Sequence, residues 1–264
     1  MTDYGDELFK GTAWYYSRYR PLYPASLIRF LVERFSLDGK GHMLDLGCGT
    51  GQLALRFADW FEGIVGVDPE IEMIEEAMRL GKEYRVGNLK WFPGDLDTYK
   101  KTMDLDYRLV TIAKAFHWMN REQVLDTLYE MVSSGGGVAI VDDYSPHKKI
   151  LPWQQKVNEL VKQWYGLERR AGKTTYSEPA LPYQDIISAS KFELEIHELP
   201  PYEHVWTVDS IIGNLYSTSY AAKRFLGGKA PLFEKQLKEE LLKIDDSGVF
   251  KEQITISIKL AIKN

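Results

Sequence analysis

The sequence predicts a doubly wound α/β domain, built on a mostly parallel sheet with helices on both faces. Three observations predict this fold class. Short apolar stretches alternate with amphipathic segments between residues 25 and 142, alternating glycines follow the first such stretch, and the chain ends in alternating apolar residues. Regular alternation of strands and helices favours parallel strands that are joined by helical crossovers.

The individual elements follow from the spacing of apolar residues. A spacing of three or four residues predicts helices over 25–35, 53–61, 70–80 and 121–132. Short apolar or β-branched runs predict strands over 43–46, 63–68, 89–92, 108–113 and 137–141.

After Asp142 the alternation of strand and helix stops. Apolar and aromatic residues from Trp153 to Trp164 share one helical face, and a polar stretch follows to Pro182, so we interpret this segment as a helical lid insertion. Alternating apolar residues over 192–196 and 254–262 predict two strands, with helices over 208–216 and 232–244 between them. The last strand is expected to close the sheet in antiparallel orientation.

Composition limits what the chain can do. Its 264 residues suit one domain, and 44% hydrophobic and 27% charged residues are typical of globular proteins. A formal charge of -5 disfavours nucleic acid as a partner. The first ten residues lack the apolar core of a signal peptide and no later run is long enough to span a membrane, so we expect a cytoplasmic protein without membrane contact.

Three alternating glycines, Gly47, Gly49 and Gly51, follow the first predicted strand. Glycine permits a tight turn and lets a ligand approach the main chain, so we expect a ligand at the carboxyl end of this strand. The Gly-x-Gly-x-Gly spacing differs from the dinucleotide fingerprint and from a phosphate loop, and therefore favours a nucleoside without a pyrophosphate. Cys48, the single cysteine, excludes an internal disulfide and is interpreted as a packed residue rather than a reactive thiol.

Asp68 ends the second predicted strand. A carboxylate there can accept hydrogen bonds from both hydroxyls of a ribose, or it can merely cap the following helix. The glycine turn upstream favours the ribose.

These residues resemble the motifs of a known family. Residues 44–52 and 65–68, together with Gly94-Asp95-Leu96, are similar to motifs of class I S-adenosylmethionine-dependent methyltransferases, which have a Rossmann-like fold. Residues 16–24 and 113–118 resemble the small-molecule subgroup of the type-11 and trans-aconitate methyltransferase-like kind. We accordingly divide the single domain into an N-terminal helical cap (1–40), a cofactor-binding core (41–142), the lid insertion (143–190) and C-terminal strands and helices (191–264).

The resemblance implies S-adenosylmethionine as cofactor and S-adenosylhomocysteine as product. The glycine turn with Cys48 would pass under the methionine portion, Asp68 followed by Pro69 would hold the ribose, and Asp95 with Leu96 would flank the adenine. The main chain of Ala113 and Lys114 would meet the amino group, and Arg20 with Tyr16 or Tyr15 would reach the carboxylate.

His117 is the candidate catalytic residue, because a neutral imidazole can take a proton from the acceptor near physiological pH. It could equally form a wall of the pocket or have no role in the site. The remaining candidates for the acceptor pocket are aromatic residues expected above the carboxyl ends of the strands, namely Trp118, Tyr144, Trp153, Tyr216 and Tyr220. For any single one of them packing in the core is the favoured interpretation, whereas as a group they favour a closed pocket.

No metal site is predicted. The five histidines are scattered without the spacing or cysteine partners that zinc prefers. The Asp142-Asp143 pair suits a solvated turn better than the magnesium site of some oxygen methyltransferases.

The predicted function is methyl transfer to an oxygen, nitrogen or carboxylate of a small metabolite by in-line displacement, by a monomer or a homodimer. Such a displacement needs alignment of the reactants and exclusion of water. Two alternatives are a regulatory protein that binds the cofactor without turnover and a methyltransferase that modifies a macromolecule. The acidity and the lack of an Asn/Asp-Pro-Pro-Tyr/Phe-type motif disfavour the latter.

Overall fold

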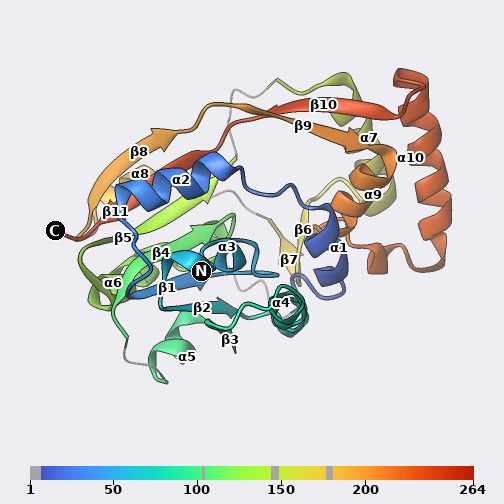
Figure 1. Cartoon of the computed structure of the whole chain (residues 1–264). Coiled ribbons are helices and arrows are strands. Elements are labelled where there is room, and N and C mark those ends of the chain that lie inside the picture. Colours follow the sequence, from blue (N-terminus) through green and yellow to red (C-terminus); the bar gives the residue numbers. More distant parts are fainter. Residues whose placement is uncertain (1–6, 103–104, 144–148, 177–180) are drawn as a thin grey trace.

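The computed structural model describes residues 7–102, 105–143, 149–176 and 181–264. A seven-stranded sheet in the order β3-β2-β1-β4-β5-β11-β8 forms its centre (Figure 1). The strands with parallel partners are β1 His42–Leu46, β2 Gly63–Asp68, β3 Leu89–Pro93, β4 Tyr107–Ala113 and β5 Val132–Asp142. β11 (Ser257–Ile262) runs antiparallel to both β5 and β8 (Glu193–Glu198). The predicted fold class is confirmed.

Helices cover both faces of this sheet. Met43 and Leu44 are neighbours on β1 and therefore point to opposite faces, and each lies in a different core. The core around Met43 includes residues of α2 (Ala25–Arg34) and α3 (Gln52–Arg56). The core around Leu44 includes residues of α6 (Arg121–Met131) and α8 (Tyr183–Ser188). Two further helices, α4 (Ile71–Glu83) and α5 (Leu96–Lys100), follow β2 and β3.

A second body of the molecule has its own hydrophobic core, and we call it the helical module. It consists of α7 (Pro152–Tyr165), α9 (Val208–Tyr216), α10 (Ala230–Ile244) and the antiparallel pair β9 (Tyr202–Thr207) and β10 (Val249–Ile254). Figure 1 shows β9 and β10 reaching from the sheet to α10. Helix α1 (Ala13–Tyr19) packs against the module, because a Cβ at Gly213 of α9 would overlap the Tyr19 ring. It also contacts α4, since the Ser17 hydroxyl donates to Glu76 at 2.6 Å.

Several elements differ from the predictions. The predicted strand 254–262 is two strands, β10 and β11, which belong to different sheets. β9 was not predicted. The predicted helix 53–61 ends at Arg56 and continues as a 3-10 turn over Ala58–Trp60.

The segment predicted as a lid is not one packing unit. α7 packs in the helical module, whereas Ile186 and Ile187 of α8 are buried in the core of the main sheet. Between them lies a short hairpin of β6 (Arg170–Ala171) and β7 (Thr174–Thr175). The module therefore combines part of residues 143–190 with part of residues 191–264. In the described part of the chain, none of the helices has both the length and the apolar character that crossing a membrane requires.

Candidate functional site

The glycine turn after β1 uses its amide hydrogens within the protein. The amides of Gly47 and Cys48 both donate to the carbonyl of Val67, at 2.8 and 3.1 Å. The amide of Gly51 donates to the carbonyl of Cys48 at 2.9 Å. A phosphate loop instead directs its amides at the ligand. Because these amides are already donated, the turn does not have the character of a pyrophosphate site.

Close packing explains why the turn needs glycines. At Gly51 the backbone has φ +79°, and a Cβ there would overlap the ring of Trp91. A Cβ at Gly47 would lie 2.5 Å from the Cβ of Ala115, in the loop that follows β4. This loop therefore rests directly on the glycine turn, which brings His117 and Trp118 to the carboxyl edge of the sheet.

Two buried carboxylates hold the turn in place. Asp68 accepts hydrogen bonds from the amides of Gly49, at 2.8 Å, and Glu70, at 2.9 Å. Asp45 accepts from the hydroxyl of Thr111 at 2.7 Å. Burial raises the pKa of each carboxyl to about 6. Asp68 thus contacts both the turn and Glu70, the residue that precedes α4, but it does not cap the helix itself.

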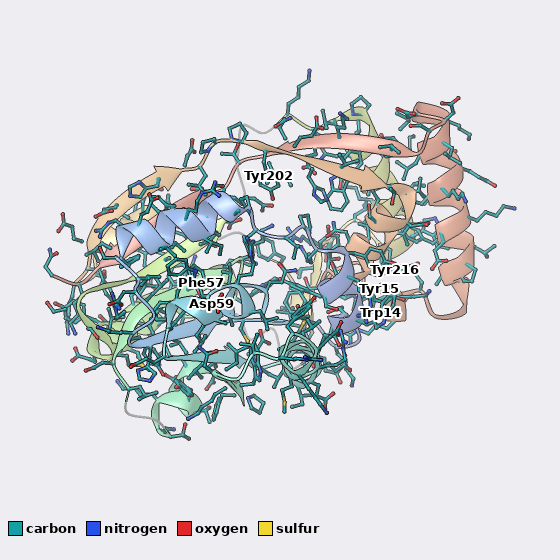
Figure 2. The ribbon with its side chains drawn as sticks, viewed as in Figure 1. Trp14, Tyr15, Phe57, Asp59, Tyr202 and Tyr216 are labelled. Atoms are coloured by element: carbon teal, nitrogen blue, oxygen red, sulfur yellow. The ribbon has the colours of Figure 1, made fainter. Side chains whose placement is uncertain are left out.

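Tyr16 and Arg20, at the end of α1, also meet the glycine turn. A Cβ at Gly49 would lie 3.5 Å from the Tyr16 ring, so the ring packs against the turn. The guanidinium of Arg20 stacks 4.9 Å from the centre of the same ring, and its Nη2 donates to the carbonyl of Ser217 at 3.3 Å. Arg20 Nε is buried without a partner. Tyr15 instead lies beside Tyr216, at 5.2 Å between ring centres (Figure 2).

A chain of aromatic rings connects this turn with the loop after β4. Phe9 lies 6.5 Å from Tyr16 and 6.1 Å from Trp118, and Trp118 lies 5.6 Å from Tyr176, all between ring centres and edge to face. His117 lies 4.4 Å from Trp118 and 5.9 Å from Tyr176. Such edge-to-face pairs stabilise one another and present apolar faces.

Tyr220 reaches the same cluster through an arginine. The guanidinium of Arg169 lies 4.7 Å from the ring of Tyr220 and 4.8 Å from that of Tyr176. We call His117, Trp118, Arg169, Tyr176 and Tyr220 the aromatic wall.

His117 is a neutral imidazole at physiological pH. Burial, together with the positive charges of Arg169 and Arg121, lowers its pKa to about 4. A base this weak takes a proton poorly from an alcohol or an ammonium group. The wall interpretation of His117 is therefore favoured over general base catalysis.

The other predicted cofactor residues lie at the same edge but in different environments. Asp95 is exposed and accepts from the amide of Thr98 at 2.8 Å, capping α5, while Leu96 is buried in the sheet core. Pro69 is exposed and Cys48 is buried. Ala113 ends β4, and the amide of Lys114 donates to the carbonyl of Val141 at 2.9 Å.

Two predicted pocket residues, Trp153 and Tyr216, do not join the aromatic wall. Trp153 packs against Phe250 at 5.6 Å, and Tyr216, which is 1% exposed, donates its hydroxyl to Glu234 at 2.9 Å. Both are core residues of the helical module, which agrees with the core-packing interpretation of single aromatic residues and not with their place among the pocket candidates. Tyr144 lies outside the described residues.

Sequence reasoning missed Trp91, Tyr176, Arg121 and Arg169. Trp91 could have been inferred from the glycine turn, because a glycine that leaves no room for a Cβ implies a bulky side chain on a nearby strand. Tyr176 and Arg169 flank a short polar hairpin whose residues gave no periodic pattern.

Among the described residues, no group of three or more potential metal ligands comes together, and Asp143 pairs with Lys114 Nζ at 2.6 Å.

Comparison with known proteins shows what part of the chain is similar to. The family described as "Methyltransferase domain" matches residues 43–136, which contain the glycine turn, Asp68 and His117. This part of the chain is thus similar to a methyltransferase domain. An uncharacterized methyltransferase of Schizosaccharomyces pombe is 27% identical over 57% of this chain and 57% of its own length. A probable S-adenosylmethionine-dependent methyltransferase of Saccharomyces cerevisiae is 28% identical over 47% of this chain and 43% of its own length. The chain thus spans about half the length of these relatives.

Solved structures show the same fold as this chain. The YcgJ protein of Bacillus subtilis aligns with a TM-score of 0.56 at 18% identity, over 91% of this chain and all of that one. Phosphoethanolamine N-methyltransferase 2 of Haemonchus contortus, solved with phosphomonomethylethanolamine and S-adenosylhomocysteine, aligns with a TM-score of 0.55 at 16% identity, over 100% of this chain and 58% of that one. The resemblance to class I methyltransferases is confirmed; the subgroup stays a prediction.

Proposed function

We propose that this chain transfers a methyl group from S-adenosylmethionine to a small-molecule acceptor at the carboxyl edge of the sheet. The observation that carries the proposal is the continuous chain of aromatic rings that begins at Tyr16, which packs against the glycine turn. It runs through Phe9 to Trp118 and Tyr176. It links the expected cofactor position to an apolar wall, where a sulfonium and an acceptor could meet away from water.

The residues at the turn fit this cofactor. The buried, unpartnered Nε of Arg20 can donate to the carboxylate of the methionine portion. The Asp68 carboxylate accepts two amides in the structure and has capacity for about four hydrogen bonds, so two ribose hydroxyls can still donate to it. The Tyr16 ring, which packs on Gly49, would move along the turn to admit the ligand and would then face the sulfonium.

Methyl transfer mainly requires that the protein align the cofactor with the acceptor. When bound, S-adenosylmethionine supplies an electrophilic methyl group, which an acceptor lone pair takes as the carbon–sulfur bond breaks and its electrons return to sulfur. Arg20 and Asp68 would fix the two ends of the cofactor, and the aromatic wall would exclude water and orient the acceptor. His117 stays neutral, so an acceptor proton, where there is one, would leave to solvent.

Calorimetric titration with S-adenosylhomocysteine tests the first half of this proposal. We expect the wild-type chain to bind it, and Asp68→Asn to bind about 10- to 100-fold more weakly, because hydrogen bonds to a charged group contribute about 1.5–3 kcal/mol. Asp59→Asn, at an exposed position, is the control and should leave the affinity unchanged. Absence of binding in the wild type would refute the proposal.

Methyl transfer itself is tested by offering labelled S-adenosylmethionine with a panel of small alcohols, amines and carboxylic acids. Transfer to at least one member is the expected result. Binding of the cofactor without transfer to any member, or label on RNA or protein instead, would favour the regulatory or the macromolecule alternative.

A further inference from the structure

Arg121 is a half-buried cation that forms no ion pair with another described residue. It begins α6, four residues after His117, and its Nε and Nη1 are both buried and make no hydrogen bond among the described residues. Burying these N–H groups without partners is unfavourable, because their lost hydration is not replaced. The amide end of α6 adds partial positive charge at the same place. Nothing in the described packing offsets this cost.

Arg169 brings a second positive charge to the same wall. Its guanidinium stacks on the rings of Tyr176 and Tyr220, and no carboxylate of the described residues forms an ion pair with it. Stacking leaves the N–H groups at the edge of the guanidinium plane free to donate. Arg169 shares the Tyr176 ring with His117, which lies 5.9 Å from that ring, and Arg121 follows His117 by four residues. Both positive charges lower the pKa of the His117 imidazole.

The two acidic residues at the end of β5 make no hydrogen bond to Arg121 Nε or Nη1. Asp143 is held by Lys114 Nζ at 2.6 Å, and Asp142 accepts the amide of Asp143 at 2.8 Å. Asp142 and Arg121 both influence the pKa of Tyr183, in opposite directions, yet no hydrogen bond joins Asp142 to Arg121 Nε or Nη1.

We propose that the acceptor carries an anionic group, a carboxylate or a phosphate, that Arg121 and Arg169 bind beside His117. This inference rests on the proposed function and names the class of its substrate. A planar guanidinium donates two parallel hydrogen bonds to either group, and the rings of Trp118, Tyr176 and Tyr220 would contact the apolar remainder of the molecule. An acceptor whose nucleophile is already unprotonated also agrees with the weak basicity of His117.

Three small aromatic probes test the charge requirement on protein saturated with S-adenosylhomocysteine. Benzoate and benzamide have nearly the same shape and differ in charge, and phenyl phosphate separates a phosphate preference from a carboxylate preference. We expect benzoate or phenyl phosphate to bind at least tenfold more tightly than benzamide in calorimetry at constant ionic strength. Arg121→Gln should reduce the ratio of these affinities tenfold or more. Arg121→Lys, which keeps the positive charge, should retain part of the ratio.

Arg170→Gln is the matched control, because Arg170 is the exposed neighbour of Arg169 and stacks on Phe225 instead. It should leave the preference unchanged. The affinity for S-adenosylhomocysteine is measured for the wild type and for every variant. A wild-type chain that does not bind it would contradict the proposed function, independently of the anionic acceptor. Intact cofactor binding with equal affinity for benzoate, phenyl phosphate and benzamide, or an unchanged preference in Arg121→Gln, would overturn the anionic acceptor.

Discussion

The parallel half of the sheet and the helical module are held together in different ways. Around β1 and β2, the backbone is held by a glycine turn with positive φ angles, by two buried carboxylates and by close packing against the Trp91 ring. The module is held mainly by apolar and aromatic side chains, among them Phe233 and Leu237, which are fully buried. The family match covers residues 43–136, within the first region only. We infer that the cofactor site depends on exact backbone placement, whereas the module needs only to fill space and close the acceptor side.

The largest expected effects come from removing one buried ring in each region. Phe57 and Phe233 are both 0% exposed, so Phe57→Ala and Phe233→Ala should each cost about 3–5 kcal/mol of local stability. Hydrogen exchange should show Phe57→Ala weakening the strands β1 and β2, and Phe233→Ala weakening α9 and α10. Only Phe57→Ala should strongly reduce binding of S-adenosylhomocysteine.

Leu232→Ala is the control for the module, since Leu232 precedes Phe233 and is 61% exposed. It should change neither exchange nor binding measurably. Equal loss of cofactor binding in both phenylalanine variants would mean that the two regions unfold as one unit.

A smaller effect is expected from one methyl group in the turn. Gly51→Ala should lower the free energy of unfolding by about 2–4 kcal/mol, because a left-handed backbone and overpacking against Trp91 each add roughly 1–2 kcal/mol. Urea unfolding measures the change. Gly87→Ala, where a Cβ would meet nothing within 4 Å, should be neutral. Gly51→Ala combined with Trp91→Leu should recover part of the loss, and no recovery would show that backbone strain dominates.

The same contrast explains what could be predicted from the sequence. The glycine turn, Asp68 and the five central strands carry local signals, since alternating glycines and short apolar runs leave few other structures. The break between β10 and β11 carried none. Ile254, Ile256 and Ile258 are all buried and alternate without interruption across the break, so periodicity alone predicted one strand. Whether Trp153 and Tyr216 lie in a core or a pocket was open for a related reason, because an aromatic residue in a helix has the same sequence pattern in both places.

The buried carboxylates give the next prediction, on pH. The pKa of Asp68 rises from 3.8 to about 6 on folding, so the folded chain holds this proton more tightly and stability falls as pH rises from about 4 to 6. Binding has the opposite sign, since the ionised carboxylate accepts the ribose hydroxyls. The affinity for S-adenosylhomocysteine should therefore rise up to tenfold per pH unit below about 6 and level off above it. Calorimetry from pH 5 to 8 measures this dependence.

Asp68→Asn separates Asp68 from Asp45, whose carboxyl has a pKa raised to about 6 as well. The variant should bind more weakly and with little dependence on pH. A slope that persists in Asp68→Asn would assign the titration to Asp45 and to the shape of the turn.

The smallest expected effect concerns His117, at the boundary between the two regions. With a pKa of about 4 the imidazole is neutral throughout the working pH range, so His117→Asn should lower the rate of methyl transfer less than tenfold. The pH–rate profile between 6 and 9 should keep its shape, measured with any acceptor that the panel identifies. His197→Asn, on β8 beside Glu195, is the control for loss of a histidine elsewhere. A general base contributes about 10²- to 10⁴-fold, so a loss of that size with a changed pH profile would restore His117 to a catalytic role.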